Sequence, residues 1–418
     1  MHSSITTIDN LSYIESVSLD KIVEEFGSPC YVYSKDAISR NFLNYQRALS
    51  SRDHLICYAV KSNSNIAVLQ TLAQLGAGFD IVSVGELERV LMAGGDPAKV
   101  VYSGVAKTAT EMRRALQVDI HCFNVESESE LCLLNQTAAE MNTQAPVSLR
   151  VNPNVDAKTH PYISTGLKEN KFGIDIDQAF DIYQRAAQMK NISVVGVDCH
   201  IGSQLTEISP FIDAMQHLLA LVDRLAASNI KLKHIDIGGG LGVRYQKEVV
   251  PSLASYMKAL LPLLENRSET LVLEPGRSIT ANAGVLLMQV QVIKNNGDKN
   301  FAIVDAAMND MLRPALYEAW MDINPIKIKT DRIEKKYDVV GPICETGDFL
   351  GKDRTLAIAE GDYLYLSSAG AYGFTMSSNY NSRPRVAEVM VDGNKAHLIR
   401  ARETFSDLVR GEQLIKEP

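Results

Sequence analysis

The sequence predicts an α/β protein in which a (β/α)8 TIM barrel is joined to a second, mainly β domain. Up to about residue 276, short apolar runs alternate with segments of helical spacing, which is typical of parallel βαβ units. Eight such units in roughly 250 residues fit a barrel. An open, doubly wound sheet is the alternative from strand counting alone. After about residue 280, strand-like runs follow one another with little helix between most of them.

Eight apolar runs are the candidate barrel strands. In chain order they are HLICYAV (from 54), GFDIVS (78), VVYSG (100), DIHCFNV (119), VSLRVNP (147), VVGVDCHIG (194), KHIDIGGG (233) and TLVLEPG (270). Between them, NIAVLQTLAQLG carries apolar residues at a helical spacing. A second helix is predicted in SPFIDAMQHLLALVDRLAAS, with Ser209 as its N-cap and Pro210 after it.

The second domain is predicted from five further runs: GVLLMQVQVIKNN, NFAIVDAA, YDVVGPIC, GDYLYLSSAG and RVAEVMVDGNKAHLIRA. Within the last, EVMVDGNKAHLI indicates a hairpin around Asp392-Gly393, because Asp-Gly favours a two-residue turn.

Composition excludes several classes of function. The 418 residues are 46% hydrophobic and 22% charged, and the net charge of −8 makes a nucleic-acid partner unfavourable. No apolar run approaches the roughly 20 residues that span a bilayer, and the N-terminus lacks the pattern of a signal peptide. The six scattered cysteines show no CxxC and no paired histidine motif, which favours free thiols in a reducing cytoplasm over disulfides or a metal site.

Chemically active residues stand where the predicted strands end, the face on which barrel enzymes carry their active sites. Alone, each has an ordinary explanation: Lys61 can extend to solvent, a triple glycine can form a turn, and a histidine can be structural. Their coincidence on one face predicts a site. They are Lys61 after the first strand, Asp80 and Ser83 after the second, His200 and Ser203 after the sixth, Gly238–Gly240 after the seventh and Glu274–Arg277 after the eighth.

These residue types together suit pyridoxal 5'-phosphate. Lys61 can form a Schiff base with its aldehyde. Glycines after strand seven expose backbone N–H groups to a phosphate, and Arg277 adds a cation. A carboxylate keeps the pyridine nitrogen protonated, so that the ring withdraws electrons from the substrate Cα.

The segments YAVKSN, HIGSQ, GGGLG, EPGRS, CETGD and GAYG resemble, in the same order, the motifs of diaminopimelate decarboxylases. These fold-type III pyridoxal-phosphate enzymes include ornithine and arginine decarboxylases and share the fold of alanine racemase. The resemblance runs from about residue 27 to beyond 400. It implies a cofactor-binding barrel over 33–276 and a β-sandwich or barrel-like domain over 277–418 together with 1–32. One departure is Ser62, where the motif more usually has alanine.

The resemblance implies a role for each residue of the barrel. Lys61 corresponds to the Schiff-base lysine, His200 to the ring stacked on the cofactor, and Glu274 to the partner of the pyridine nitrogen. Asp80 is expected to steady the lysine region, although an ordinary carboxylate at a strand end is about as plausible. The cofactor contacts implied are Asp80, His200, Ser203, Gly239, Gly240, Glu274, Pro275, Gly276, Arg277 and Tyr372.

In the second domain, the resemblance implies that Arg313 and Tyr317, together with Arg277, contact the distal end of the substrate, which Tyr372 also touches. Glu345 would hold the distal ammonium group, and Cys344 would return a proton to Cα. Members of the family build each active site from both subunits of a homodimer, with CETGD reaching across. We therefore expect a homodimer.

Two distinctions decide the reaction. Racemases of this fold pair the pyridine nitrogen with arginine, whereas Glu274 suits the stronger electron sink of a decarboxylase. Arg313 offers a cation for a distal carboxylate, which favours meso-diaminopimelate, with L-lysine and carbon dioxide as products in the last step of lysine biosynthesis. An ornithine-, arginine- or polyamine-pathway decarboxylase is the alternative, and a racemase is less favoured. A non-catalytic, antizyme-like relative would be expected to lose the lysine, the cysteine or the phosphate motif.

Overall fold

The computed structural model describes residues 4–156, 165 and 170–415, and these form two compact units. The barrel unit comprises Ser39–Arg244 and Glu248–Ile279, and the β unit comprises the remaining described residues. No helix within the described ranges is long and apolar enough to cross a membrane.

The barrel unit is built on parallel strands that close into a ring. Each neighbouring pair is parallel, in the order β9-β11-β12-β13-β5-β6-β7-β8, and a pairing of β8 with β9 completes the circle. The predicted barrel is therefore confirmed and an open sheet is excluded. The strands are β5 (His54–Ala59), β6 (Gly78–Ile81), β7 (Val100–Tyr102), β8 (Cys122–Val125), β9 (Ala145–Asn152), β11 (Ile192–Asp198), β12 (His234–Asp236) and β13 (Thr270–Leu273), with β10 (Ile174–Asp175) paired to β9.

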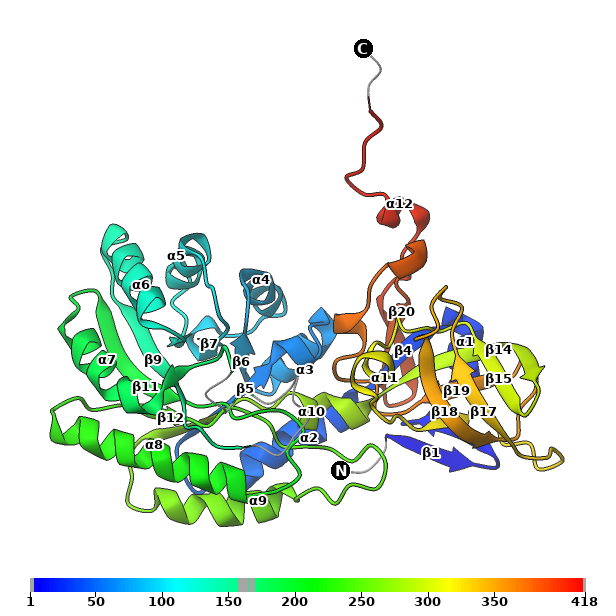
Figure 1. Ribbon diagram of the computed structural model, residues 1–418, viewed down its shortest axis with the longest axis horizontal. Coiled ribbons are helices and arrows are strands. Elements are labelled where there is room, and N and C mark those ends of the chain that lie inside the picture. Colours follow the sequence, from blue (N-terminus) through cyan, green and yellow to red (C-terminus); the bar gives the residue numbers. More distant parts are fainter. Residues whose placement is uncertain (1–3, 157–164, 166–169, 416–418) are drawn as a thin grey trace. The chain divides into compact units, whose positions relative to one another are not determined.

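Helices alternate with these strands, and Figure 1 shows α6, α7 and α8 outside β9, β11 and β12. Asn65 caps α3 and Ser83 caps α4 through their side chains, which satisfies N–H groups that the first turn leaves unpaired. The helices are α2 (Lys35–Ala48), α3 (Ile66–Gln74), α4 (Val84–Met92), α5 (Ala109–Gln117), α6 (Glu128–Glu140), α7 (Ile176–Gln188), α8 (Ser209–Ala227), α9 (Leu253–Leu260) and α10 (Arg277–Thr280).

The predicted N-cap of α8 is wrong by one residue. Ser209 is already helical, and the cap position falls on Ile208, which makes no side-chain cap bond. Pro210 lies in the first turn of the helix. N–H groups there have no acceptor within the helix, so proline loses no hydrogen bond, and its fixed φ suits the helical conformation.

Part of the barrel interior is an apolar cluster. Cys57, Val101, Cys122, Val195 and Val272 form one buried cluster, with residues from five strands around the ring. Burial of such side chains contributes roughly 1.5–3 kcal/mol each for the larger ones, which favours the closed ring over separate strands.

The β unit contains a sheet in the order β18-β17-β15-β14-β4-β20-β21, in which β19 also pairs with β14 and β16 pairs with β19. Its N-terminal contribution is β4, which pairs with β14 and β20. The elements are β1 (Ile5–Ile8), β2 (Leu11–Ile14), β3 (Val17–Ser18), α1 (Leu19–Phe26), β4 (Cys30–Ser34), β14 (Gly284–Asn296), β15 (Lys299–Val304), α11 (Arg313–Tyr317), β16 (Ile323–Pro325), β17 (Lys335–Val340), β18 (Phe349–Leu356), β19 (Tyr363–Leu366), β20 (Ala387–Asp392), β21 (Lys395–Arg400) and α12 (Phe405–Leu408).

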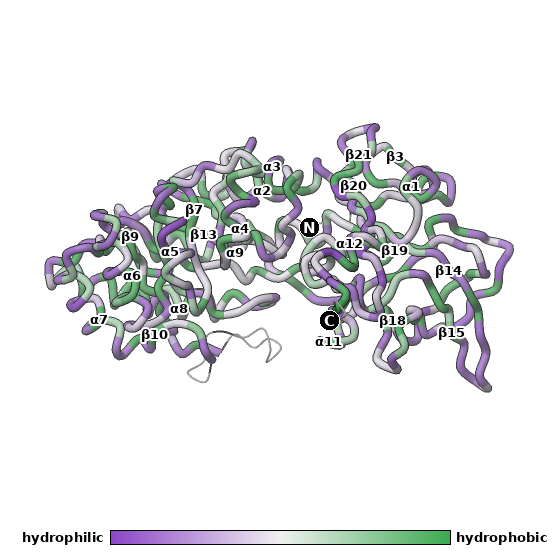
Figure 2. Tube along the Cα trace, turned by 90° about the horizontal axis from the view of Figure 1, so that it is seen from above, coloured by the Kyte–Doolittle hydropathy of each residue, from purple (hydrophilic) through white to green (hydrophobic). Residues whose placement is uncertain are grey.

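All five strand-like runs predicted here form strands. The predicted hairpin joins β20 to β21, with Gly393 and Asn394 between the paired residues Asp392 and Lys395. The strands β1 to β4, β16 and β18 lie outside the five predicted runs. Figure 2 shows hydrophilic colouring at the tip of the β14–β15 hairpin, in agreement with the exposed end of β14.

Candidate active site

Lys61 and Asp80 meet where β5 and β6 end. Lys61 lies in a single 3-10 turn, Val60–Ser62, directly after β5, and its ammonium bonds Asp80 Oδ2. The Asp80 side chain is fully buried, whereas that of Lys61 is 35% exposed. The ion pair holds the lysine nitrogen at the strand ends while leaving part of the side chain accessible.

His200 follows β11 and is held by the glycine turn after β12. The Gly239 N–H donates to His200 Nδ1 over 3.2 Å, so Nδ1 is the acceptor and the neutral ring carries its proton on Nε2. Burial lowers the pKa of His200 well below its ordinary value, and the charges of Arg150 and Lys61 lower it further. The ring therefore stays uncharged at neutral pH.

The glycines bring backbone groups closer together than a side chain would allow. A Cβ on Gly239 would lie 2.2 Å from the carbonyl oxygen of Glu274. Gly240 has a φ of +102°, and a Cβ there would lie 2.5 Å from the carbonyl oxygen of Gly202. The ends of β11, β12 and β13 are thus drawn together by positions that require glycine.

Arg277 and Ser203 form a polar pair at the same strand ends. Arg277 Nη2 donates to Ser203 Oγ over 3.0 Å, and Nε lies 3.3 Å from the same oxygen. Arg277 is only 7% exposed, so its charge acts in surroundings from which most water is excluded. A buried guanidinium beside a hydroxyl is suited to binding a phosphate or carboxylate group.

Ser62, the departure from the family motif, lies against the Pro275–Gly276 segment. A Cβ on Gly276 would lie 3.0 Å from Ser62 Oγ, and the Ala59 N–H donates to the Pro275 carbonyl. The Ser62 hydroxyl donates to the Ala59 carbonyl over 2.8 Å. The extra hydroxyl is thus accommodated without leaving a buried donor unsatisfied.

Glu274 belongs to a group of three buried carboxylates. Oxygens of Glu274, Asp236 and Asp198 all lie within 4.8 Å of one another. Burial and the neighbouring negative charges raise the pKa of Asp198 and Glu274 well above normal. Burial also raises the pKa of Asp236 to about 7, although the Gly238 N–H that it accepts opposes this. The group would be stabilised by a positive charge.

Only part of the negative charge of these three carboxylates is balanced by a cation of the chain. Arg150 bonds Glu126 over 2.7 Å, and its Nε is 3.8 Å from Asp198 Oδ2. Within the described ranges, Asp198 Oδ1 and Asp236 Oδ2 are buried and have no hydrogen-bond partner. Asp198 and Asp236 were not predicted as site residues, although charged residues inside otherwise apolar strands could have indicated them.

In the β unit, Cys344 and Glu345 lie in a turn braced by the segment that follows Ser378. The Asn381 side chain accepts a 2.8 Å bond from the Cys344 N–H, and Tyr380 Oη donates to Glu345 over 2.8 Å. The thiol is exposed. Sequence analysis missed Tyr380 and Asn381, because nothing near them resembles a motif.

The other predicted residues of the β unit lie at two further positions. Arg313 begins α11 and is 6% exposed, with its guanidinium carbon 4.5 Å from the ring centroid of Tyr245. Tyr317 ends the same helix. Tyr372 has a φ of +55°, a left-handed conformation that non-glycine residues adopt mainly where the surroundings impose it. From the sequence, Arg313 could also be a surface arginine at the start of a helix, and its burial excludes that alternative.

The barrel group fits a cofactor that has an aldehyde, an anionic group and a basic ring nitrogen. Lys61 supplies an amine, the Gly239–Gly240 turn and the Arg277–Ser203 pair supply donors, and Glu274 with its neighbouring carboxylates can accept a protonated nitrogen. The segment VDAKTHPYISTGLKENKFGI, a candidate closing loop by length and glycine content, lies mostly outside the described residues.

Comparisons with known proteins agree with this chemistry. Residues 35–281 match the family model described as pyridoxal-dependent decarboxylase, pyridoxal binding domain. Diaminopimelate decarboxylases of Pseudomonas aeruginosa and Vibrio cholerae are 61% and 58% identical, with 97% and 98% of both chains covered. The structure of the Helicobacter pylori diaminopimelate decarboxylase complexed with L-lysine is 43% identical, covers 94% of this chain and 98% of that one, and has a TM-score of 0.91.

Proposed function

The chain belongs to the diaminopimelate decarboxylases, a family of pyridoxal-dependent decarboxylases, and from this premise we propose that it converts meso-2,6-diaminopimelate to L-lysine and carbon dioxide. The observation that carries the reaction type is Glu274, buried among carboxylates at the end of β13 in the same barrel as Lys61. Such surroundings stabilise a protonated pyridine nitrogen, which suits decarboxylation better than the weaker electron sink of a racemase.

Within the barrel, each residue has a separate task. When bound, pyridoxal phosphate accepts the electron pair that is left on Cα as carbon dioxide departs. Lys61 would hold the aldehyde covalently, and Asp80 positions the lysine nitrogen. The neutral ring of His200 would pack against the cofactor, and Glu274 would hold the pyridine nitrogen. The phosphate of the cofactor would be bound by Arg277, Ser203, Gly239 and Gly240. Pro275 and Gly276 would supply the remaining contacts of this phosphate-binding segment.

Residues of the β unit act on the substrate. Arg313 and Arg277 bind the distal carboxylate, Glu345 binds the distal ammonium, and Tyr317 and Tyr372 contact the substrate. After the bond between Cα and its carboxyl carbon breaks, the Cys344 thiol gives a proton to Cα, and solvent returns one to the thiolate. The exposed position of Cys344 suits that exchange.

Carbon dioxide release tests the function directly. The purified protein, loaded with pyridoxal phosphate, is offered meso-diaminopimelate, L-ornithine, L-arginine and L-lysine in parallel. Release from diaminopimelate alone is the expected result. Release from one of the basic amino acids instead would support the ornithine- or arginine-type alternative, and interconversion of stereoisomers without release would support a racemase.

Arg313→Ala is expected to weaken turnover of diaminopimelate by roughly 10²-fold or more in kcat/KM. Removing one partner of a buried charge-assisted contact usually costs about 2–5 kcal/mol. Because the lost contact is to the distal carboxylate, the penalty should be much smaller for a substrate analogue that lacks this group. Steady-state kinetics on both compounds provide the measurement.

Arg332→Ala is the matched control, since this arginine of the β unit bonds Asp362 and has no assigned role at the site. An equal loss on both substrates with Arg313→Ala would show that Arg313 is structural. Circular dichroism of the two variants separates misfolding from a binding defect.

Gly239→Ala is expected to weaken cofactor binding by roughly 10- to 100-fold, because a new Cβ would overlap the Glu274 carbonyl and overpacking typically costs about 1–3 kcal/mol. The dissociation constant for pyridoxal phosphate, measured from absorbance, tests this. In Gly85→Ala, the new Cβ has only an ordinary contact with Ser83, so this variant should bind the cofactor normally. Equal affinities of the two variants for pyridoxal phosphate would contradict the proposed role of Gly239 in binding the cofactor.

We further propose that the protein acts in the cytoplasm as a homodimer in which the Cys344–Glu345 segment completes the site of a second copy. The assignment to a dimer comes from the family resemblance. Six unpaired cysteines support a reducing compartment. Sedimentation at working concentration gives the assembly state.

A further inference from the structure

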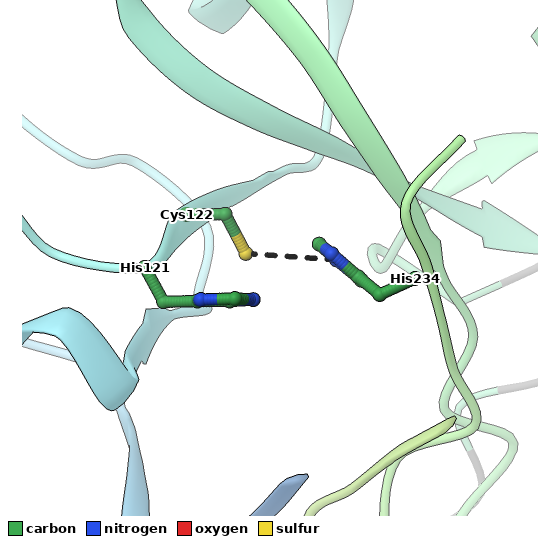
Figure 3. A group of neighbouring side chains, drawn as sticks. All are labelled: His121, Cys122 and His234. Atoms are coloured by element: carbon green, nitrogen blue, oxygen red, sulfur yellow. Dashed lines mark hydrogen bonds between the residues drawn. The ribbon is translucent and has the colours of Figure 1, made fainter. Parts of the chain in front are cut away.

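A second group of reactive side chains lies at the opposite end of the barrel strands from Lys61. His121 directly precedes β8, Cys122 is the first residue of β8, and His234 is the first residue of β12. Figure 3 shows the three side chains pointing toward one another, with Cys122 Sγ 3.8 Å from His234 Nε2. One ligand atom from each lies within 4.8 Å of the other two.

The two histidines have the properties of metal ligands. His121 Nε2 is buried and has no hydrogen-bond partner among the described residues, while the ring also bonds the backbone of Ala98. Metal-binding histidines commonly donate their other ring N–H to a carbonyl in this way. Neutral imidazole is a common metal ligand through either of its ring nitrogens.

The neighbouring strand makes room for one of these rings. A Cβ on Gly196 of β11 would lie 2.0 Å from His234 Nε2 and 2.4 Å from two ring carbons. Only glycine at this position lets the imidazole lie where it does. The arrangement of the ring is thus fixed by the packing of β11 against β12.

A cavity of about 430 Å³ gives access to the group. Both histidines line it, together with Gln144, Lys233 and Thr270. Because the two histidines border this cavity, a water molecule in it could supply a fourth ligand. The ammonium of Lys233 opposes a cation, and a thiol must lose its proton when it binds a metal ion. These two costs favour a moderate affinity.

Two imidazole nitrogens and one thiolate suit Zn²⁺, which is commonly four-coordinate with such ligands. Zinc–nitrogen bonds of about 2.0–2.1 Å and zinc–sulfur bonds of about 2.3 Å imply ligand separations of roughly 3.3–3.6 Å in a tetrahedron. The observed 3.8 Å between Cys122 Sγ and His234 Nε2 is close to this value. The remaining separations, all within 4.8 Å, can close by rotation of the side chains.

We propose that His121, Cys122 and His234 form a binding site for a divalent transition-metal ion, Zn²⁺ by its ligand chemistry, at the N-terminal end of the barrel. In the ring, β9 and β11 separate β8 from β12, so the ion would join two strands that do not pair. Because the metal ion would bind the folded chain and not the unfolded one, it would shift the folding equilibrium towards the folded barrel. This inference does not depend on the proposed decarboxylase activity.

The test is equilibrium dialysis of the pyridoxal-phosphate-loaded protein against buffered Zn²⁺, followed by metal analysis. About one ion per chain is expected for the native protein, with a rise in its thermal midpoint. His121→Asn and Cys122→Ala should each lower the zinc affinity at least tenfold and remove the thermal shift. The matched controls Cys132→Ala, which removes an exposed thiol, and His217→Asn, which changes another barrel histidine, should retain both.

A second readout identifies the ligand atoms. Co²⁺ in place of Zn²⁺ should give a thiolate-to-cobalt charge-transfer band in difference spectra, present in the native protein and absent in Cys122→Ala. His121→Asn changes a partly exposed side chain and is chosen in case Cys122→Ala fails to fold. Zinc retained equally by His121→Asn and the controls would overturn the proposal, because the ion would then be bound adventitiously elsewhere.

Discussion

Lys61→Ala should lose decarboxylation by on the order of 10⁴-fold or more, the scale seen when an enzyme loses its nucleophile. The amine is held at the end of β5 by the fully buried side chain of Asp80. Borohydride should attach the cofactor permanently to the native protein and not to the variant. Mass spectrometry of the treated chains measures this attachment independently of turnover.

Lys61→Arg separates the nucleophile from the charge. Arginine can keep an ion pair with Asp80, but its guanidinium stays protonated and cannot attack an aldehyde. It should therefore be as inactive as the alanine variant while being more stable to heat. Lys258→Ala, which changes an exposed lysine of α9, should be fully active. Retained turnover in Lys61→Arg would refute the covalent role.

Cys344→Ala is expected to slow turnover by about 10²–10⁴-fold, the usual range for the loss of a general acid. Because the proton is needed only after carbon dioxide has left, substrate binding should change little and the loss should fall mainly on kcat. Cys132→Ala removes the other exposed thiol and should have no effect. An unchanged kcat in Cys344→Ala would show that another group protonates Cα.

The proposed sharing of sites between subunits gives these two variants a combined test. The two variants, Lys61→Ala and Cys344→Ala, are mixed in equal amounts and allowed to exchange subunits. Half of the resulting dimers are then hybrids that contain one subunit of each variant. Each hybrid has one intact site, so about a quarter of the native activity should return. No recovery despite demonstrated exchange would mean that Lys61 and Cys344 of one site come from the same chain.

Much of the barrel could be predicted because its signals are local. Unbroken apolar runs such as Leu271–Leu273 identify buried parallel strands, and strand ends in a barrel share one face. This is why residues as distant in sequence as Lys61 and Glu274 could be assigned to one region. The N-cap of α8 was missed by one residue, since helix ends depend on small backbone differences that propensity does not resolve.

What the sequence did not reveal depends on contacts between distant segments. Asp198 and Asp236 look like isolated polar residues in strands, and only parallel pairing of β11 with β12 puts them side by side. His121 and His234 are 113 positions apart and fit no metal-ligand spacing. Spacing rules recognise ligands on one hairpin or helix, whereas these are assembled by barrel closure.

Two glycines described above differ in how they constrain the evolution of this chain. At Gly196 the three atoms nearest to a new Cβ all belong to the side chain of His234, so a smaller residue at position 234 would remove these contacts. The two changes must occur in that order. At Gly239 the obstacle is the Glu274 carbonyl, which every amino acid carries, and no mutation at position 274 can remove it. A change at position 196 can therefore be compensated by a change at position 234. A change at position 239 cannot be compensated by a change at position 274.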